Sequence, residues 1–429
     1  MLTSTMLLQW IVGALLLQAA AWLALSFARH WQTYTGLRVA AAKGRFELPA
    51  PAEVAPFDAS ALGWAGFRPF RVQARTVEDT AGQVCSFLLA PEDGEPLPLF
   101  LPGQFLTFRL DLPSAQGGTA PVVRCYSLSD APHAEAYRVT VKRMPLRAGA
   151  AASAHVSHYF HDQVRVGSLL QVRAPGGHFV LDPDPSPAVL IAGGIGITPM
   201  LSMIYWAVQQ QPEREVWLFY GVRDAAELVM QPHLEALAAN HPQFHLHLCF
   251  SGPQSPNASL ARPAQVQHHH SRIDVRLLRS VLPLKPHHFY VCGPADLLTS
   301  LVPALDGWGV PAERIHVEAF GPANIPRRHA ATIPPGQTSI GRAPIPLAVT
   351  FASSGKTCDW RPGRGSLLDL AEAHGVPVAT GCRSGSCGSC QTTIRSGQVE
   401  YLQMPDFDPE PGSCLLCVST PVTDVTLEA

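Results

Sequence analysis

The chain has 429 residues, with 31 lysines and arginines against 33 aspartates and glutamates, so its formal net charge is −2. At about 150 residues per domain, this length predicts two or three domains. The near-neutral charge lacks the basic surplus of a nucleic-acid-binding protein, and we expect no nucleic-acid partner. Five of the 10 cysteines lie near the C-terminus and the others are isolated, which is unlike a secreted disulfide framework.

The N-terminal segment is predicted to be a membrane anchor. Its 22 residues from Met6 to Phe27 are nearly all apolar, and as a helix they would rise about 33 Å, enough for the ~30 Å bilayer core. A cleaved signal peptide would need a positive charge before this run, whereas Arg29 and Lys43 follow it. The positive-inside rule therefore predicts a single-pass anchor over residues 1–28, with the catalytic domains in the cytoplasm.

A connector over residues 29–62, rich in alanine and proline, precedes a series of short alternating segments bounded by Gly, Pro and Asp. Such regular short strands predict a small antiparallel β-barrel over residues 63–182. The expected strands include Gly66–Val72, Ser86–Leu89, Phe105–Leu110, Tyr137–Lys142 and Leu169–Val172.

One strand of this barrel carries Arg124, Tyr126 and Ser127. A bound flavin needs an aromatic face against its ring, a hydroxyl near its N5 atom and a cation for its phosphates. Arg124 and Tyr126 share a face of the strand because side chains alternate. From these residues alone, an ordinary strand with a surface arginine is an equally good interpretation.

Residues 183–322 predict a parallel α/β domain. Val189–Ala192 is a buried-strand run, and Gly193–Pro199 then reads Gly-Gly-Ile-Gly-Ile-Thr-Pro before a helical pattern. A strand, a glycine turn and a helix start form a cradle for a pyrophosphate, although a tight turn without ligand is the simpler alternative. We interpret His268–His270 as a solvated loop. Later strands end near residues that should meet at the same edge of the sheet, namely Gly221, Arg223, Ser251, Cys292 and Gly293.

The C-terminal cysteines predict an iron–sulfur cluster. Cys382, Cys387 and Cys390 are spaced C-x4-C-x2-C, and Cys414 and Cys417 follow. A loop with this spacing plus one distant cysteine is typical of a [2Fe-2S] cluster. Zinc would favour two paired C-x2-C knuckles, and disulfides would be unusual in a cytoplasmic domain.

This region resembles a plant-type ferredoxin over residues 345–429. Two short strands near Val349 and Trp360 and a helix over Ser366–His374 precede the cysteine loop, in the order that this family uses. The resemblance implies an α+β fold of the β-grasp type. It places the fourth ligand at Cys417 and leaves Cys414 as a bystander, so the predicted ligands are Cys382, Cys387, Cys390 and Cys417.

The two preceding domains resemble the ferredoxin-NADP reductase superfamily, and in particular the reductase portion of flavohaemoglobins. The similarity lies in R-x-Y-S-x-S at Arg124–Ser129, G-G-x-G-x-T-P at Gly193–Pro199 and C-G-P at Cys292–Pro294. It implies FAD in preference to FMN. No cation closely follows Ser251, which favours NADH over NADPH.

The resemblance also assigns roles to individual residues. Ser127, Cys292 and Phe320 would lie at the reacting rings, with Cys292 near the nicotinamide and Phe320 over the flavin, although Cys292 also fits a small buried core residue. The cofactor-binding residues would be Arg124, Tyr126, Ser127, Lys142, Val156, Ser157, Gly193, Gly194, Gly196, Thr198, Pro199, Gly221, Arg223, Gly293, Pro294 and Phe320.

The predicted fold is therefore multidomain: a transmembrane helix, a flavin barrel, a nucleotide domain, a linker over residues 323–344 and a ferredoxin domain. Such a chain would pass electrons from NADH through FAD and a [2Fe-2S] cluster to a protein acceptor, a membrane-bound oxygenase, hydroxylase or desaturase. A stand-alone membrane reductase of quinone or another small acceptor is an alternative. A redox sensor without catalysis would not need the hydride-transfer residues, which argues against that class.

Overall fold

This computed structural model shows one compact unit, Ser60–Ala429, to which every described residue belongs. The predicted transmembrane segment Met6–Phe27, the connector 29–62 and the linker 323–344 lie outside the described residues. Within the described part of the chain, no helix has the length and apolarity to cross a membrane. The described residues are 63, 64, 66–113, 118–145, 156–252, 265–320, 346–381, 383, 385–402, 405 and 407–429.

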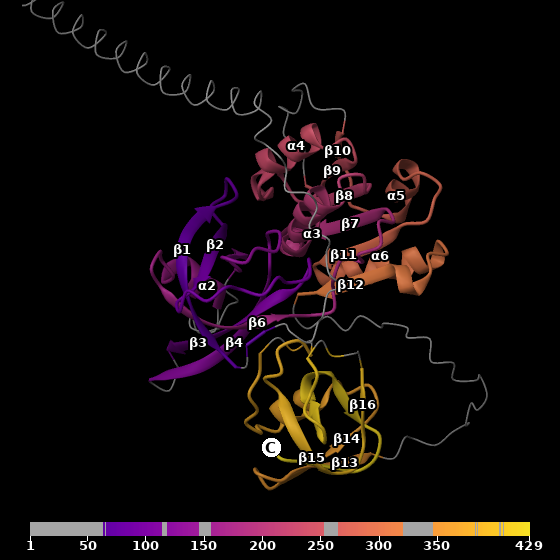
Figure 1. Cartoon of the computed structure of the whole chain (residues 1–429). Helices are drawn as coiled ribbons and strands as arrows, with labels where there is room; N and C mark the ends of the chain where they lie inside the picture. The colour runs from indigo at the N-terminus through magenta and orange to yellow at the C-terminus, as the bar shows by residue number, and fades with distance from the viewer. Residues whose placement is uncertain are drawn as a thin grey trace, which may run out of the picture. The chain divides into compact units, whose positions relative to one another are not determined.

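The first sheet is a six-stranded antiparallel barrel in the order β4-β3-β6-β1-β2-β5, with its strands indigo to magenta in Figure 1. A bridge between Leu128 and Val139 joins the two edges, since it links the end of β4 to β5. The strands are β1 (Arg68–Val77), β2 (Val84–Pro91), β3 (Phe105–Pro113), β4 (Thr119–Ser127), β5 (Tyr137–Lys142) and β6 (Leu169–Gly176).

The barrel closes around large apolar side chains because its strands alternate. Phe87 and Val139 are fully buried, whereas Leu88 and Arg138 on the other face are only half-buried. Helix α2 (Val156–Asp162) adds Phe160, whose ring packs edge-on against Phe87 at 5.3 Å. Burial of each such phenylalanine contributes about 1.5–3 kcal/mol to the stability of the folded state.

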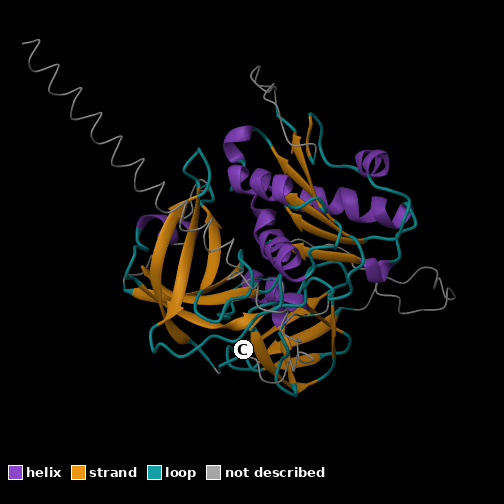
Figure 2. Ribbon diagram, turned by 45° about the horizontal axis from the view of Figure 1, so that its top comes forward, coloured by secondary structure: helices purple, strands orange, loops and turns teal. Residues whose placement is uncertain are grey.

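The second sheet is wholly parallel, in the order β10-β9-β8-β7-β11-β12. Helices α3 and α4 pack on one face and α5 and α6 on the other (Figure 2). Its strands are β7 (Ala188–Gly193), β8 (Val216–Val222), β9 (Phe244–Phe250), β10 (Val266–His269), β11 (His288–Gly293) and β12 (Ile315–Ala319). The helices are α3 (Ile197–Gln210), α4 (Gln231–Asn240), α5 (Val275–Val281) and α6 (Ala295–Gly307). Short 3-10 turns are η3 (Gly194–Gly196), η4 (Ala225–Glu227), η5 (Ala312–Arg314) and η6 (Leu416–Val418).

The strand order places a topological switch point between β7 and β11. From β7 the chain builds outward through β8, β9 and β10, and then returns to β11 on the other side of β7. The carboxyl ends of these two central strands are where open α/β sheets bind ligands. The glycine turn Gly193–Gly196 begins at this point.

The interpretation of His268–His270 as a solvated loop is wrong for two of its residues. His268 and His269 lie in the edge strand β10 and are half-buried, because β10 pairs in parallel with β9. The polar composition of this segment gave no strand pattern, and its pairing partner β9 lies in another part of the chain.

The third region holds a five-stranded sheet, β14-β13-β19-β15-β17, in which β13 and β19 pair in parallel. The predicted helix begins at the N-cap Ser366, which forms a capping box with Asp369, a motif that stabilises by about 1 kcal/mol. Its elements are β13 (Leu347–Phe351), β14 (Lys356–Trp360), α7 (Leu367–Ala373), β15 (Gln391–Ser396), β17 (Ser413–Leu415) and β19 (Val425–Leu427). A separate pair joins β16 (Val399–Tyr401) to β18 (Ser419–Pro421). The predicted multidomain, sheet-rich architecture is confirmed; the exact domain boundaries stay predictions.

The histidines of the second sheet predict acid lability. Burial lowers the pKa of His247 to about 3, and its ring stacks on Phe219 at 4.6 Å. In the unfolded chain this histidine takes up a proton near pH 6.5, so between about pH 6.5 and 3 the unfolded state binds more protons and stability falls as the pH falls. At pH 5 this one group lowers the free energy of unfolding by about 2 kcal/mol.

Between pH 7.5 and pH 5, the melting temperature of the variant His247→Phe is therefore expected to fall less than that of the wild type. Thermal unfolding followed by circular dichroism measures this difference. His133→Phe, at an exposed histidine of the barrel, is the control and should follow the wild type. Equal pH dependence of His247→Phe and wild type would contradict the assignment.

Candidate functional site

The flavin segment contains a buried hydroxyl that the protein does not satisfy. Ser127 is 4% exposed, and its Oγ has no hydrogen-bond partner among the described residues. An unpaired buried polar group is costly, so such a position fits a polar atom of a bound ligand. The neighbouring Tyr126 packs edge-on against Phe108 and Phe160 at 5.8 and 5.1 Å, and burial raises the pKa of its phenol. The residues present therefore fit a flavin whose polar edge reaches Ser127.

Arg124 links this segment to the cysteine loop. Its Nη1 donates to the carbonyl oxygen of Val123 at 2.7 Å and to that of Gly381 at 3.2 Å. Gly381 directly precedes Cys382, the predicted ligand that lies outside the described residues. The cation expected to compensate flavin phosphates thus also contacts the backbone of the predicted cluster loop.

The other predicted flavin contacts lie near the start of α2. Val156 and Ser157 form the first turn of this helix. Ser157 Oγ accepts a hydrogen bond from the Met144 amide at 3.2 Å. Lys142 lies 3.9 Å from Glu227 Oε1, so it ties the barrel to the nucleotide domain. Cofactor contacts by these residues stay predictions.

The glycine turn after β7 has two distinct uses for its glycines. A Cβ atom on Gly196 would lie 2.2 Å from the Cys292 carbonyl oxygen, and one on Gly193 would lie 2.7 Å from Pro294 Cδ. Gly194 instead has φ +53° and faces open space. Two glycines therefore permit close packing of β7 and β11, and the third leaves the backbone exposed. Thr198 Oγ1 donates to Ile195 O at 3.1 Å and, with buried Pro199, fixes the start of α3. This arrangement fits a pyrophosphate cradle.

The end of β11 completes this edge. A Cβ on Gly293 would lie 2.9 Å from Gly193 Cα, so the two strand ends touch without side chains, and Pro294 is the N-cap of α6. Cys292 is fully buried, and burial raises the pKa of its thiol, which keeps it neutral. A neutral thiol is a poor nucleophile, so no nucleophilic role is expected for Cys292. Its place near the nicotinamide stays a prediction. Phe320 follows β12 with 42% of its surface exposed, and its role over the flavin stays a prediction.

Glu227 lies in the turn after β8 and was not among the residues predicted from the sequence. Arg223 Nε donates to Glu227 Oε1 at 2.8 Å, and this guanidinium lowers the pKa of the Glu227 carboxyl. Gly221, at the same strand end, packs near Ile273, whose Cδ1 would lie 3.1 Å from an added Cβ. The sequence does contain a signal for this ion pair: Arg223 and Glu227 are four positions apart, a spacing that brings opposite charges together within one turn.

Thiols from separate segments converge in the third region. Cys390 Sγ and Cys417 Sγ lie 3.1 Å apart, although 27 positions separate them, and Cys387 is also buried. Cys382 lies outside the described residues, and the described part alone contains no set of three or more side chains that could hold a metal ion. The cluster assignment therefore depends on the cysteine spacing and on the family match below. Cys414 points into the core of this domain, where burial raises the pKa of its thiol to about 11.

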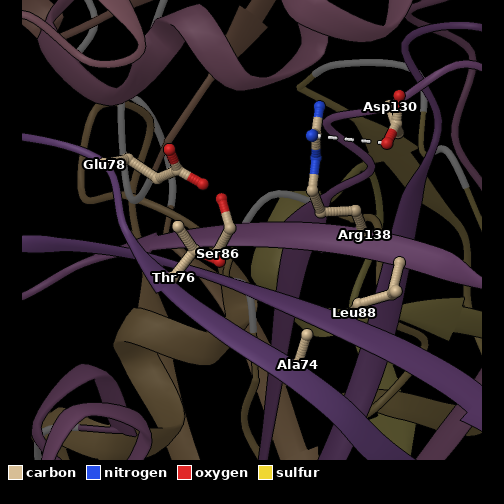
Figure 3. Close-up of a pocket in the computed structure, with 7 residues that line it drawn as sticks. All are labelled: Ala74, Thr76, Glu78, Ser86, Leu88, Asp130 and Arg138. Carbon is tan, nitrogen blue, oxygen red and sulfur yellow. Dashed lines mark ion pairs between the residues drawn. The ribbon is translucent and has the colours of Figure 1, made fainter. Parts of the chain in front are cut away.

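A pocket of about 240 Å³ lies on the outer face of the barrel, between β1, β2 and β5. Figure 3 shows Glu78 on one side of it and the ion pair of Arg138 and Asp130, 3.3 Å apart, on the other. The Arg138 guanidinium also lies 5.4 Å from the ring of Tyr205 in α3. None of the predicted flavin residues line this pocket. Through Arg138, this polar pocket borders the contact between the barrel and the nucleotide domain.

Comparison with known proteins defines the class of the chain. Residues 190–302 match the family model of the oxidoreductase NAD-binding domain, and residues 349–422 match that of the 2Fe-2S iron-sulfur cluster binding domain. These two matches make the chain an oxidoreductase that joins an NAD-binding domain to a 2Fe-2S domain.

Individual relatives cover parts of this arrangement. The chain is 36% identical to a flavohemoprotein of Bacillus cereus over 262 residues, which is 61% of this chain and 62% of that protein's length. It is similar to the flavohem-like FAD/NAD-binding domain of nitric oxide dioxygenase from Vibrio cholerae, with 29% identity, a TM-score of 0.51, and coverage of 60% of this chain and 100% of that one. An intact type IV self-sufficient cytochrome P450 monooxygenase shares the fold at 23% identity and a TM-score of 0.54, over 85% of this chain and 41% of that one.

The family matches confirm an NAD-binding domain and a [2Fe-2S] domain, and the similarity to an FAD/NAD-binding domain agrees with the predicted flavin. The individual residue assignments stay predictions. Glu227 and Arg173 were not among the residues predicted from the sequence, and the contact of Arg124 with the cysteine loop was not foreseen. Both arginine contacts join segments more than 200 residues apart.

The choice of Cys417 as the fourth ligand is testable against Cys414. Cys417→Ser is expected to abolish the visible absorbance of the cluster and its iron content, because one of four thiolates is lost. Cys414→Ser, the matched control three positions earlier, is expected to keep both. Iron analysis and visible spectra of the purified proteins measure this. The reverse outcome would assign the ligand to Cys414.

Proposed function

We propose that this protein is an NADH-dependent reductase that passes electrons through FAD and a [2Fe-2S] cluster to a protein acceptor, a membrane-bound oxygenase, hydroxylase or desaturase. The hydrogen bond from Arg124 to Gly381 carries this proposal most directly. It joins the strand expected to bind flavin to the loop expected to bind the cluster. Two redox centres held on touching segments can exchange electrons.

The chain's own residues would bind and orient the nucleotide and the flavin, and the cofactors would supply the redox chemistry. When bound, FAD would supply a hydride acceptor that can release single electrons, and the cluster would supply a one-electron carrier. Arg124 offers positive charge to phosphates, and Ser127 offers its unpaired hydroxyl. The backbone around Gly194 offers room for the nucleotide's pyrophosphate. The neutral thiol of Cys292 fits a site that needs no general base.

The activity of the cluster-free variant tests the proposed path. In Cys417→Ser, NADH-driven reduction of ferricyanide, a small acceptor that can take electrons from flavin, is expected to persist. Reduction of cytochrome c, a protein acceptor, is expected to fall by at least tenfold, as its electrons should come from the cluster. Cys414→Ser should keep both rates. Equal loss or equal retention of the two activities in Cys417→Ser would contradict a path through the cluster.

The preference for NADH is supported by the charge at the end of β8. Arg223 is the cation best placed there for a 2′-phosphate, and it is already paired with Glu227. The carboxylate of Glu227 would repel a phosphate. We therefore infer that the pair disfavours NADPH.

Glu227→Gln is expected to raise kcat/KM for NADPH relative to NADH by about fivefold, since it removes one negative charge beside the site, worth about 1 kcal/mol. Steady-state kinetics with both nucleotides measure this ratio. Glu215→Gln is the matched control, because Glu215 is also ion-paired, with Lys285, but precedes β8 at the opposite edge of the sheet. An unchanged ratio in Glu227→Gln would contradict the inference.

We also propose that Met6–Phe27 anchors the protein in a membrane with its domains in the cytoplasm, on the strength of its apolar length and the cations that follow it. The full chain is expected in the membrane pellet after carbonate washing, and a chain lacking residues 1–28 in the supernatant with its ferricyanide activity retained. Recovery of the full chain in the supernatant would contradict the anchor.

A further inference from the structure

Arg173 of β6 contacts residues of both the barrel and the third region. Its Nη1 donates to the carbonyl oxygen of Cys387, a predicted cluster ligand, at 3.0 Å. Its guanidinium carbon lies 5.0 Å from the ring centroid of Phe67, just before β1, and 5.6 Å from that of Phe407. We call Phe67, Arg173, Phe407 and the Cys387 carbonyl the arginine clasp.

Phe407 is itself fixed to the cysteine loop. Its amide donates to the carbonyl oxygen of Gly385 at 3.1 Å. A Cβ atom on Gly388 would lie 2.6 Å from the Phe407 ring, so the ring lies directly on the backbone between Cys387 and Ser389. Contacts therefore connect the barrel, through Arg173 and Phe407, to the loop that holds three of the four predicted ligands.

The chemistry of the clasp suits arginine specifically. A planar guanidinium can stack on aromatic rings and donate in its own plane at the same time, whereas a lysine ammonium cannot do both. The Arg173 side chain is half-buried, so its hydrogen bond is less screened than a surface contact. A hydrogen bond to a ligand's carbonyl restrains the backbone that presents the thiolate.

We propose that Arg173 is a positioning residue for electron transfer: it holds the cluster loop against the flavin barrel. The inference rests on the proposed function and deepens it. In the step concerned, one electron leaves the reduced flavin and one enters the oxidised cluster, and no bond forms or breaks. Arg173 exchanges no proton or electron. It sets how closely and how constantly the two segments lie together.

Anaerobic stopped-flow mixing of the full-length holoprotein with NADH separates the two steps. In Arg173→Gln, flavin bleaching is expected to keep its wild-type rate, while the later cluster reduction slows by about tenfold, because small losses of positioning cost large factors in rate. Arg173→Lys keeps the charge but not the geometry, and is expected to stay slow. Arg109→Gln, at an exposed arginine of the neighbouring strand β3, removes the same charge and should behave as wild type.

A second readout does not depend on turnover. Hydrogen–deuterium exchange of peptides covering residues 385–391 and 407–410 is expected to be faster in Arg173→Gln than in wild type or Arg109→Gln. Unchanged exchange together with unchanged cluster reduction would overturn the clasp, as would full recovery of the rate in Arg173→Lys. If the wild type bleaches its flavin but never reduces its cluster, the proposed function fails, and the exchange comparison still decides the clasp.

Discussion

Two arginine side chains of the barrel donate hydrogen bonds to carbonyl oxygens of the cysteine loop, and the path from nucleotide to acceptor depends on these contacts. Arg124 reaches Gly381 and Arg173 reaches Cys387, on either side of the loop's first turns. Backbone carbonyls accept these bonds whatever the redox state of the cluster. Charged donors make them stronger than neutral hydrogen bonds. The two strands that carry them, β4 and β6, both pair with β3, so one sheet supplies both contacts.

The rest of the site is built from small and neutral groups. Gly193 and Gly293 let two strand ends touch, Cys292 fills the adjacent core as a neutral thiol, and Ser127 keeps an unpaired hydroxyl. Reactions of hydride and single electrons need little proton transfer by the protein. They need surfaces on which ring systems and phosphates lie close together.

Local patterns in the sequence predicted many of the elements and named the residues proposed for the site. The period-two strands of the barrel, the Gly193–Pro199 turn and the cysteine spacing each lie within a few residues of one another, so physical rules for turns and ligands apply directly. His268 and His269 were misread because an edge strand is recognised by its partner, here β9. Arg173 and Phe407 escaped notice for the same reason: their roles arise from contacts between distant segments, and nothing local distinguishes them from a surface arginine and a loop aromatic.

The central claim is that one chain carries electrons from NADH through a flavin to a [2Fe-2S] cluster. Anaerobic titration of the detergent-solubilised, full-length protein with NADH, followed by absorbance and electron paramagnetic resonance, tests it most directly. The account predicts loss of the flavin absorbance together with growth of the rhombic signal of a reduced [2Fe-2S] cluster. Flavin bleaching without that signal would contradict the link between the two centres, and no change with NADH or NADPH would contradict the reductase itself.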